Sequence, residues 1–479
     1  MNALRRLLPD TLVKTCICVA LLLGLTAIES RARVWLPSIF ADHMVLQQNT
    51  RIKIWGWADP WETATVKPSW SDQVFKIKGD GNASWQFYVD TPAAGGPYTL
   101  TIAAEDGEFT IRNIMMGEVW LCAGQSNMEW SAKHGVKDAI ADQKGLSNPA
   151  LRLFKMRKRG SEEKQADVEG NWSVCDSAAL RNFSAVGYFF GKQLNRELKV
   201  PVGLVDMAWG GSYIESWIPR ELVELYPDCK KSADIIPPTL YWPNKAGAIY
   251  NGMVAPLTDF RIAGVIWYQG ESNTHNPPAY YTLQHLMVEN WRRANATEFP
   301  FYYVQIAPFQ YPQDSTGKKA AYVREMQEKA LDLPKSGMVV STDLVDNLKD
   351  VHPIYKAEVG RRLANWALNE TYQVRRPDYK SPSFAKKEIR GNKVLLTFRD
   401  VSEKGLEFRK NEVMEFEIAD RSKKFTEANA RVVGKNQVEV WADDVTNPVA
   451  VRFAFSNSPS PTLFDKSGLP VVPFRTDEW

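Results

Sequence analysis

The sequence lacks the residue spacings by which many metal sites and redox centres are recognised. It has no Cys-x-x-Cys pair and no His-Glu-x-x-His motif, and only five His and five Cys occur in 479 residues. No block of Lys and Arg stands out in a chain of net charge +3, so the basic surface typical of nucleic-acid-binding proteins is excluded. We therefore expect no metal ion, no cofactor and no nucleic-acid partner.

Long apolar runs are also scarce, and the clearest one lies at the N-terminus. Arg5 and Arg6 precede an apolar stretch over residues 16–27, followed by small residues, which is the pattern of a secretory signal peptide. The run is short for a membrane span. We expect residues 1–32 to be removed and the mature protein to be periplasmic or secreted, with no membrane span. Three cysteines would remain, which allows one disulfide but no disulfide framework: Cys122, Cys175 and Cys229.

The rest of the chain falls into three regions of different pattern. Residues 33–112 contain short alternating runs separated by turn signals, which predicts an N-terminal β-sandwich domain. Residues 113–376 alternate strands with helices, which predicts an α/β domain with a doubly wound parallel sheet of five strands. Residues 377–479 return to strand patterns and predict a C-terminal β domain. The five strands are expected at 119–123, 202–205, 262–268, 301–306 and 338–341, with the last helix from Pro353 to about Asn369.

The first predicted strand of the α/β region ends just before a serine that could act as a nucleophile. The run over residues 117–124 is mostly apolar and closes on Gly124, and Gln125 then precedes Ser126. A short apolar run bounded by Gly is typical of a buried parallel strand, and ligands meet such sheets beyond the carboxyl ends of the strands. Ser126 is predicted to lie at such an end, although a serine after a strand is more often a turn residue or a helix N-cap.

Ester hydrolysis by a serine needs a base, a group that orients the base, and donors for the oxyanion. His352 is the best base among the histidines, because it lies on the predicted loop between the fifth strand and the last helix, at the same sheet edge as Ser126. Asp350 lies two positions earlier, and residues two apart in extended backbone point the same way. Its carboxylate could orient the imidazole, or it could be a charge at the start of the helix.

Two more loops are predicted to reach this edge. Residues 209–212 read Trp-Gly-Gly-Ser after the second strand, where the glycines permit close backbone approach and a free N–H, although Gly-Gly alone is more often a turn. Residues 267–273 follow the third strand and offer the carboxamides of Gln269 and Asn273. Because these loops and the Ser126 and His352 loops converge on one crevice, they predict a single hydrolytic site.

The motifs also occur in a recognisable order along the chain. They are Gly-Gln-Ser-Asn-Met at 124–128, Trp-Gly-Gly-Ser at 209–212 with Glu-Ser-Trp at 215–217, Tyr-Gln-Gly-Glu-Ser-Asn at 268–273, and Asp-Val-His-Pro at 350–353. Together they resemble the sialate O-acetylesterase family, which consists of SGNH-type serine esterases. The resemblance covers most of the chain after the leader. It implies Ser126 as nucleophile, His352 as general base, and the N–H groups of Ser126 and Gly211 in the oxyanion hole.

The chain departs from the broader SGNH pattern at two places. The pattern has Asp three residues before His, where this chain has Lys349, so Asp350 is the expected orienting acid and Asp346 and Asp343 remain alternatives. The third block is usually Gly-x-Asn-Asp, and here residues 270–273 read Gly-Glu-Ser-Asn. The side-chain oxyanion donor is therefore expected to be Gln269, with Asn273 as the alternative. Glu271 is expected to orient its neighbours.

The resemblance implies a serine esterase that removes O-acetyl groups from sugars, with sialate O-acetylesterase as the expected activity. The expected partner is an O-acetylated carbohydrate, and no cofactor is needed. One alternative keeps the chemistry and changes the substrate to acetylated xylan, pectin or another plant glycan, which the loops near residues 225–251 would decide. Another is a carbohydrate-binding protein with an inactive esterase core, against which the presence of both Ser126 and His352 argues.

Overall fold

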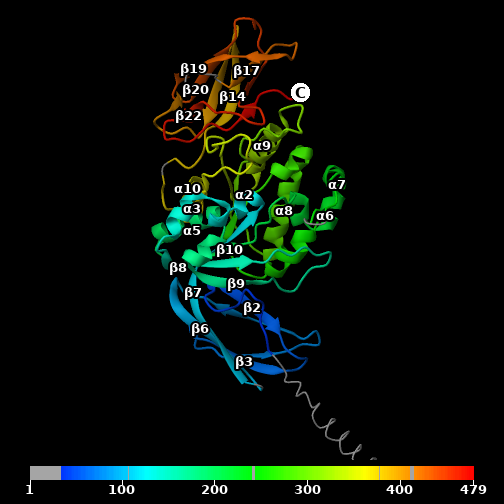
Figure 1. Ribbon diagram of the computed structural model, residues 1–479, viewed down its shortest axis with the longest axis vertical. Coiled ribbons are helices and arrows are strands. Elements are labelled where there is room, and N and C mark those ends of the chain that lie inside the picture. The colour runs from blue at the N-terminus through cyan, green and yellow to red at the C-terminus, as the bar shows by residue number, and fades with distance from the viewer. Residues whose placement is uncertain (1–33, 106, 240–242, 377, 410–414) are drawn as a thin grey trace, which may run out of the picture.

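The computed structural model describes residues 34–105, 107–239, 243–376, 378–409 and 415–479. The predicted leader therefore lies outside the described residues. Along the long axis of the molecule, the strands within residues 45–104 occupy one end, a layer of strands and helices forms the middle, and the C-terminal strands form the other end (Figure 1).

The N-terminal strands enclose one apolar core between two small sheets. Ile54 and Phe87 face inward from one sheet, and Val66 and Ile102 face them from the other. Alternate residues point to opposite faces of a strand, which explains the alternating sequence pattern. The first sheet pairs β2 (Arg51–Trp57) with β5 (Ser84–Asp90), and the second contains β4 (Phe75–Lys78), β3 (Thr63–Pro68) and β6 (Gly95–Ala104).

One long strand, β7 (Gly107–Gly124), runs from this region into the middle of the molecule. Its first part pairs with β6 and with β1 (Val45–Gln47), and its second part pairs with two parallel strands of the central sheet. The predicted boundary between residues 112 and 113 falls inside this strand. The strand that ends at Gly124 is therefore held at both ends by neighbouring strands.

The central sheet has six neighbouring parallel strands and one antiparallel edge strand, in the order β13-β12-β11-β7-β10-β8-β9. The five predicted strands correspond to β7 and β10 to β13, whereas β8 and β9 were not predicted. The exact five-stranded arrangement is thus replaced by a larger sheet. The bounds are β8 (Ser147–Met156), β9 (Gly170–Asp176), β10 (Val202–Asp206), β11 (Gly264–Tyr268), β12 (Phe301–Val304) and β13 (Ser336–Val339).

Strand β8 escaped prediction because charged residues interrupt its apolar run. Arg152 is buried, but its guanidinium donates to the carbonyl of Pro149 at 2.8 Å and to the side chain of Asn113 at 3.1 Å. Lys155 pairs with the buried carboxylate of Asp206 at 2.6 Å. Buried charges need partners of this kind, and nothing in the local sequence announces them.

Helices cover both faces of the central sheet. Trp120 and Cys122 of β7 pack in one apolar cluster with α5 (Ala185–Leu198) and α10 (Lys356–Trp366), whereas Val119 and Leu121 pack in another with α8 (Ala279–Asn295) and α9 (Lys319–Lys329). The last helix was expected to start at Pro353, but α10 begins three residues later, at Lys356. The segment expected as a loop near residues 225–251 also contains a helix, α7 (Pro227–Asp234).

Eight of the C-terminal strands form two four-stranded antiparallel sheets around a shared core that includes Leu396, Ile418 and Val451. Arg324 of α9 fixes this region to the centre, because its guanidinium donates to the carbonyls of Ser456 and Asn457 at 2.7 Å each. One sheet contains β14 (Ser383–Arg390), β15 (Lys393–Arg399), β20 (Gln437–Trp441) and β19 (Asn429–Gly434), and the other β18 (Phe425–Glu427), β17 (Phe416–Ala419), β21 (Ala450–Phe453) and β23 (Phe474–Arg475).

The cysteines within the described ranges form no disulfide. Cys122, Cys175 and Cys229 are all buried and free. Among the residues that the structure describes, no helix has the length and apolar character needed to cross a membrane. In the same part of the chain, no group of three or more His, Cys, Asp or Glu side chains is placed to hold a metal ion.

Candidate active site

Ser126 lies on a tight turn between β7 and the short helix α2 (Ser126–Glu129). Gly124 has φ +130°, and a side chain there would place its Cβ 2.2 Å from the carbonyl oxygen of Tyr268, so only Gly fits. The next residue, Gln125, donates its N–H to that same carbonyl at 2.9 Å. The turn is thus held against β11, and the partly exposed Ser126 lies at the carboxyl end of the sheet.

The structure brings Ser126 and His352 together across 226 positions of sequence. The Nε2 atom of His352 lies 2.9 Å from the hydroxyl oxygen of Ser126. The imidazole stacks on Trp130, with ring centroids 4.2 Å apart, and Trp130 stacks in turn on His134. Burial and the nearby Lys356 lower the pKa of His352, although Asp350 opposes them. His352 is therefore neutral at neutral pH and can accept a proton.

Asp350 is the acid that lies beside His352. Its Oδ1 accepts the backbone N–H of His352 at 2.9 Å and lies 3.4 Å from Nδ1 of the imidazole. Its side chain is 49% exposed. Of the two alternatives, Asp343 is paired with both terminal nitrogens of Arg362, at 2.8 and 2.6 Å. Asp346 acts electrostatically on Lys356 instead.

The Gly-Gly loop after β10 lies directly against the serine. A methyl group on Gly210 would lie 3.3 Å from Cβ of Ser126. The Gly210 N–H donates to the carboxylate of Glu129 at 2.7 Å, which fixes the loop to α2. Gly211 has φ +75°, and its N–H makes no hydrogen bond to any described residue. The first N–H groups of a helix also lack intrahelical partners, which includes that of Ser126.

The two carboxamides predicted as oxyanion donors are held in a buried network instead. Gln269 uses both amide hydrogens, donating to the carbonyl of Ser212 at 3.1 Å and to Oδ1 of Asn273 at 2.7 Å, and its Oε1 accepts from Tyr280 at 2.9 Å. Asn273 donates to Glu215 at 2.9 Å. These side chains join the loops after β10 and β11, and the bonds of Gln269 leave it no free donor for an oxyanion.

Three further polar residues lie behind Ser126, and the sequence singled out only one of them. Asn127 donates from Nδ2 to Glu271 and, at 3.0 Å, to the carbonyl of Val351, next to His352. Its Oδ1 accepts from the ammonium group of Lys356. Glu271 was expected to orient neighbours. Lys356 was missed because a lysine at a helix start usually faces solvent, and no local signal marks it as buried.

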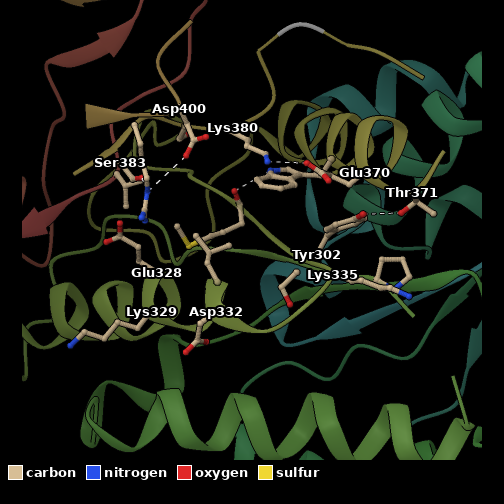
Figure 2. A pocket seen from close by; sticks show the side chains of 18 residues that line it. Tyr302, Glu328, Lys329, Asp332, Lys335, Glu370, Thr371, Lys380, Ser383 and Asp400 are labelled. Carbon is tan, nitrogen blue, oxygen red and sulfur yellow. Dashed lines mark hydrogen bonds and ion pairs between the residues drawn. The ribbon is translucent and has the colours of Figure 1, made fainter. Parts of the chain in front are cut away.

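A large cavity among the described residues lies elsewhere. It has a volume of about 870 Å³ and opens between α9, β13 and the C-terminal sheets, with Tyr302, Glu328 and Lys380 among its walls (Figure 2). Neither Ser126 nor His352 lines it. Large cavities are the usual first guess for a ligand site. The contact between the Ser126 hydroxyl and the His352 imidazole identifies a reactive site more specifically, because a nucleophile and its base must lie within hydrogen-bond distance.

Residues 116–369, which carry the site, match the family model "Carbohydrate esterase, sialic acid-specific acetylesterase". The chain is 27% identical to sialate O-acetylesterases of Homo sapiens and Pongo abelii, over 91% of this chain and 91% of each relative. The crystal structure of a carbohydrate acetylesterase from Xanthomonas citri is 34% identical and superimposes with a TM-score of 0.85, covering 93% of this chain and 100% of that one. This chain therefore belongs to the carbohydrate esterase family of sialic acid-specific acetylesterases.

Proposed function

We propose that the chain removes O-acetyl groups from a sugar by a covalent mechanism at Ser126. The Ser126 hydroxyl oxygen attacks the acetyl carbonyl carbon while its proton moves to Nε2 of His352. The bond to the sugar oxygen then breaks, and that oxygen takes the proton from His352. Water then attacks the acetyl carbonyl carbon while His352 accepts its proton. The bond to the Ser126 oxygen breaks, and that oxygen takes the proton from His352, which releases acetate and restores the hydroxyl. The 2.9 Å contact between Ser126 and His352 is the observation that carries this proposal.

Backbone groups are the best candidates for the oxyanion donors. Gly211 follows Gly210, where a Cβ would lie 3.3 Å from Cβ of Ser126, and no described residue accepts a hydrogen bond from the Gly211 N–H. Preorganised donors of this kind stabilise the charge that develops on the carbonyl oxygen. Asp350 is proposed to orient His352, because it is the one of the three candidate carboxylates that lies next to the imidazole.

For the substrate, we propose an O-acetylated sialic acid. The support is the family description together with the mammalian relatives, which are named sialate O-acetylesterases. An acetylated plant glycan is the second candidate, since the more similar bacterial relative is named only as a carbohydrate acetylesterase. The predicted leader at residues 1–32 supports action in the periplasm or outside the cell.

The mechanism is tested by Ser126→Ala with Ser177→Ala as the matched control. Ser177 also follows a strand and opens a short helix, α4 (Ser177–Arg181), but it is exposed and no imidazole contacts it. We expect Ser126→Ala to lose both acetate release and labelling by a serine-directed fluorophosphonate, and Ser177→Ala to keep both. Full activity of Ser126→Ala would refute the mechanism. Acetate release from O-acetyl sialic acid, compared with acetylated xylan and pectin, decides the substrate.

A further inference from the structure

A lysine is buried directly behind the proposed nucleophile. Lys356 opens α10, is 1% exposed, and its ammonium group donates to Oδ1 of Asn127 and lies 5.2 Å from the centre of the Tyr268 ring. A buried ammonium is costly unless it is paired or hydrogen-bonded. Yet Lys356 makes no ion pair within 4 Å with any carboxylate in the described ranges. Such a cost suggests a role beyond packing.

Asn127 connects this lysine to both halves of the proposed reacting pair. It follows Ser126 directly, and one amide hydrogen goes to the carbonyl of Val351, the residue before His352, at 3.0 Å. The other goes to the carboxylate of Glu271. With Lys356 donating to its oxygen, all the amide's hydrogen-bonding groups are used. Rotating the amide by 180° would turn its NH₂ group toward the ammonium, so Lys356 locks its orientation.

Glu271 closes the chain of contacts from the loop after β11. It is 6% exposed, and its Oε2 is buried with no hydrogen-bond partner among the described residues. Burial raises the pKa of Glu271, while the bond from Asn127 and the charges of Lys356 and Arg324 lower it. The carboxyl group of Glu271 and the ammonium group of Lys356 are thus held on opposite sides of the Asn127 amide.

We propose that Lys356, Asn127 and Glu271 form a positioning relay that fixes the serine turn, the histidine loop and the loop after β11 relative to one another. The proposal rests on the proposed function, because Ser126 and His352 are the groups that it positions. None of the three relay residues is proposed to touch the substrate. Their effect is exerted through the distance and direction between the hydroxyl and the imidazole, and misplacement by about 1 Å can cost about 10²-fold in rate.

Lys356 has a second effect, which is electrostatic. The charged groups that face it are Glu271, Asp350 and Asp346, and burial lowers its pKa to about 7. It therefore carries its proton below about pH 7. Its positive charge lowers the pKa of His352, which Asp350 raises and His134 lowers further. Removing the charge should raise the pKa of His352 and move the acid limb of the kcat/KM profile to higher pH.

The experiment separates the hydrogen bond of Lys356 from its charge. Lys356→Met removes both, Lys356→Gln keeps a donor without the charge, and Lys356→Arg keeps both. We expect Lys356→Met to lower kcat about 10²-fold with KM little changed. Both Lys356→Met and Lys356→Gln should move the acid limb of the kcat/KM profile to higher pH. The Gln variant should retain more kcat than the Met variant, and the Arg variant should keep the wild-type limb.

Arg362→Met is the matched control, because Arg362 is a buried cation on the same helix whose charge is compensated by Asp343 and Glu358. It should lower the melting temperature without moving the acid limb. A wild-type pH profile in Lys356→Gln, or an equal shift in Arg362→Met, would overturn the relay. If Lys356→Met does not fold, the Gln and Arg variants still decide. Ser126→Ala is measured in parallel: full activity there defeats the proposed mechanism itself, whereas an inactive Ser126→Ala with unchanged Lys356 variants defeats only the relay.

Discussion

The site at Ser126 and the large cavity beside β13 both gather polar side chains, but they do so in different ways. Around Ser126 the polar groups are mostly buried and hydrogen-bonded to one another, and they come from the loops that follow four different strands. In the cavity, Lys380 pairs with Glu370 at 2.9 Å, and both side chains are more than a third exposed (Figure 2). Exposed pairs of that kind contribute little free energy.

The location of the reactive groups in this molecule depends on the arrangement of hydrogen-bond donors and acceptors and not on the volume of a cavity. Groups held rigidly before the substrate arrives need no reorganisation in the transition state. The residues beside Ser126 meet that condition, because Gly124, Gln125 and Asn127 each have a fixed contact with another loop. The difference predicts that changes near Ser126 alter rates and that changes in the cavity alter stability.

The largest effect is expected from His352→Ala. Without a base at 2.9 Å from the hydroxyl, Ser126 cannot lose its proton in the attack, and kcat should fall about 10⁴- to 10⁶-fold. Acetate release from an acetylated sugar measures the loss. His134→Ala is the control, since His134 belongs to the same aromatic stack but is bonded to Ser131. The His134→Ala variant should lose less than about 10-fold in kcat, which is below the usual contribution of a proton-transfer group. Equal losses of kcat in His352→Ala and His134→Ala would contradict the role of His352 as the base.

A smaller effect is expected from Asp350→Asn. The carboxylate lies 3.4 Å from Nδ1 of His352 and is half exposed, so it orients the ring less firmly than a buried acid. We expect kcat to fall about 10- to 10²-fold, at the low end for a group that assists proton transfer. Because Asp350 raises the pKa of His352, its loss should move the acid limb to lower pH. Asp346→Asn, which leaves this contact intact, should keep the wild-type rate within about threefold. A limb that moves to higher pH would contradict the assignment.

The sequence predicted much of the central fold because apolar periodicity determines it. The second half of strand β7 and strands β10 to β13 are mostly apolar runs, and they overlap the five strands that the sequence predicted. Strand β8 was missed since its two charged residues have partners far away in the chain, Asn113 for Arg152 and Asp206 for Lys155. Patterns within a short window cannot reveal compensation that depends on the tertiary fold.

The site could be predicted only in part, for the same reason. Ser126 and His352 were identifiable because a nucleophile and a base must lie at one edge of a parallel sheet. The amide of Gln269 was expected to face an oxyanion, yet it is bonded to Ser212 and Asn273, which no spacing rule specifies. Lys356 was missed entirely, because its burial depends on how α10 packs behind the serine turn.

The smallest effect on rate is expected from Glu328→Gln in the cavity wall. Burial raises the pKa of Glu328 to about 7, although the charge of Arg399 opposes the shift. The folded state therefore binds this proton more tightly than the unfolded chain does, and stability is lost as pH rises from the unfolded pKa toward 7. Above that value the ionised carboxylate should destabilise the fold by roughly 1–2 kcal/mol after allowance for solvent access.

Replacing Glu328 with Gln removes this cost, so the variant should melt about 2–5 °C higher than the wild type at pH 8. The gain should shrink toward pH 5, where the wild-type carboxyl is largely protonated in the folded state, and the turnover rate should stay within about twofold of the wild type. Glu325→Gln is the control on the same helix: Glu325 is paired with Arg475 at 3.1 Å, so its loss should give no gain at either pH. If Glu328→Gln instead slowed acetate release by about an order of magnitude, as loss of a proton-transfer group does, the cavity would take part in the reaction, and the contrast between the two regions would no longer hold.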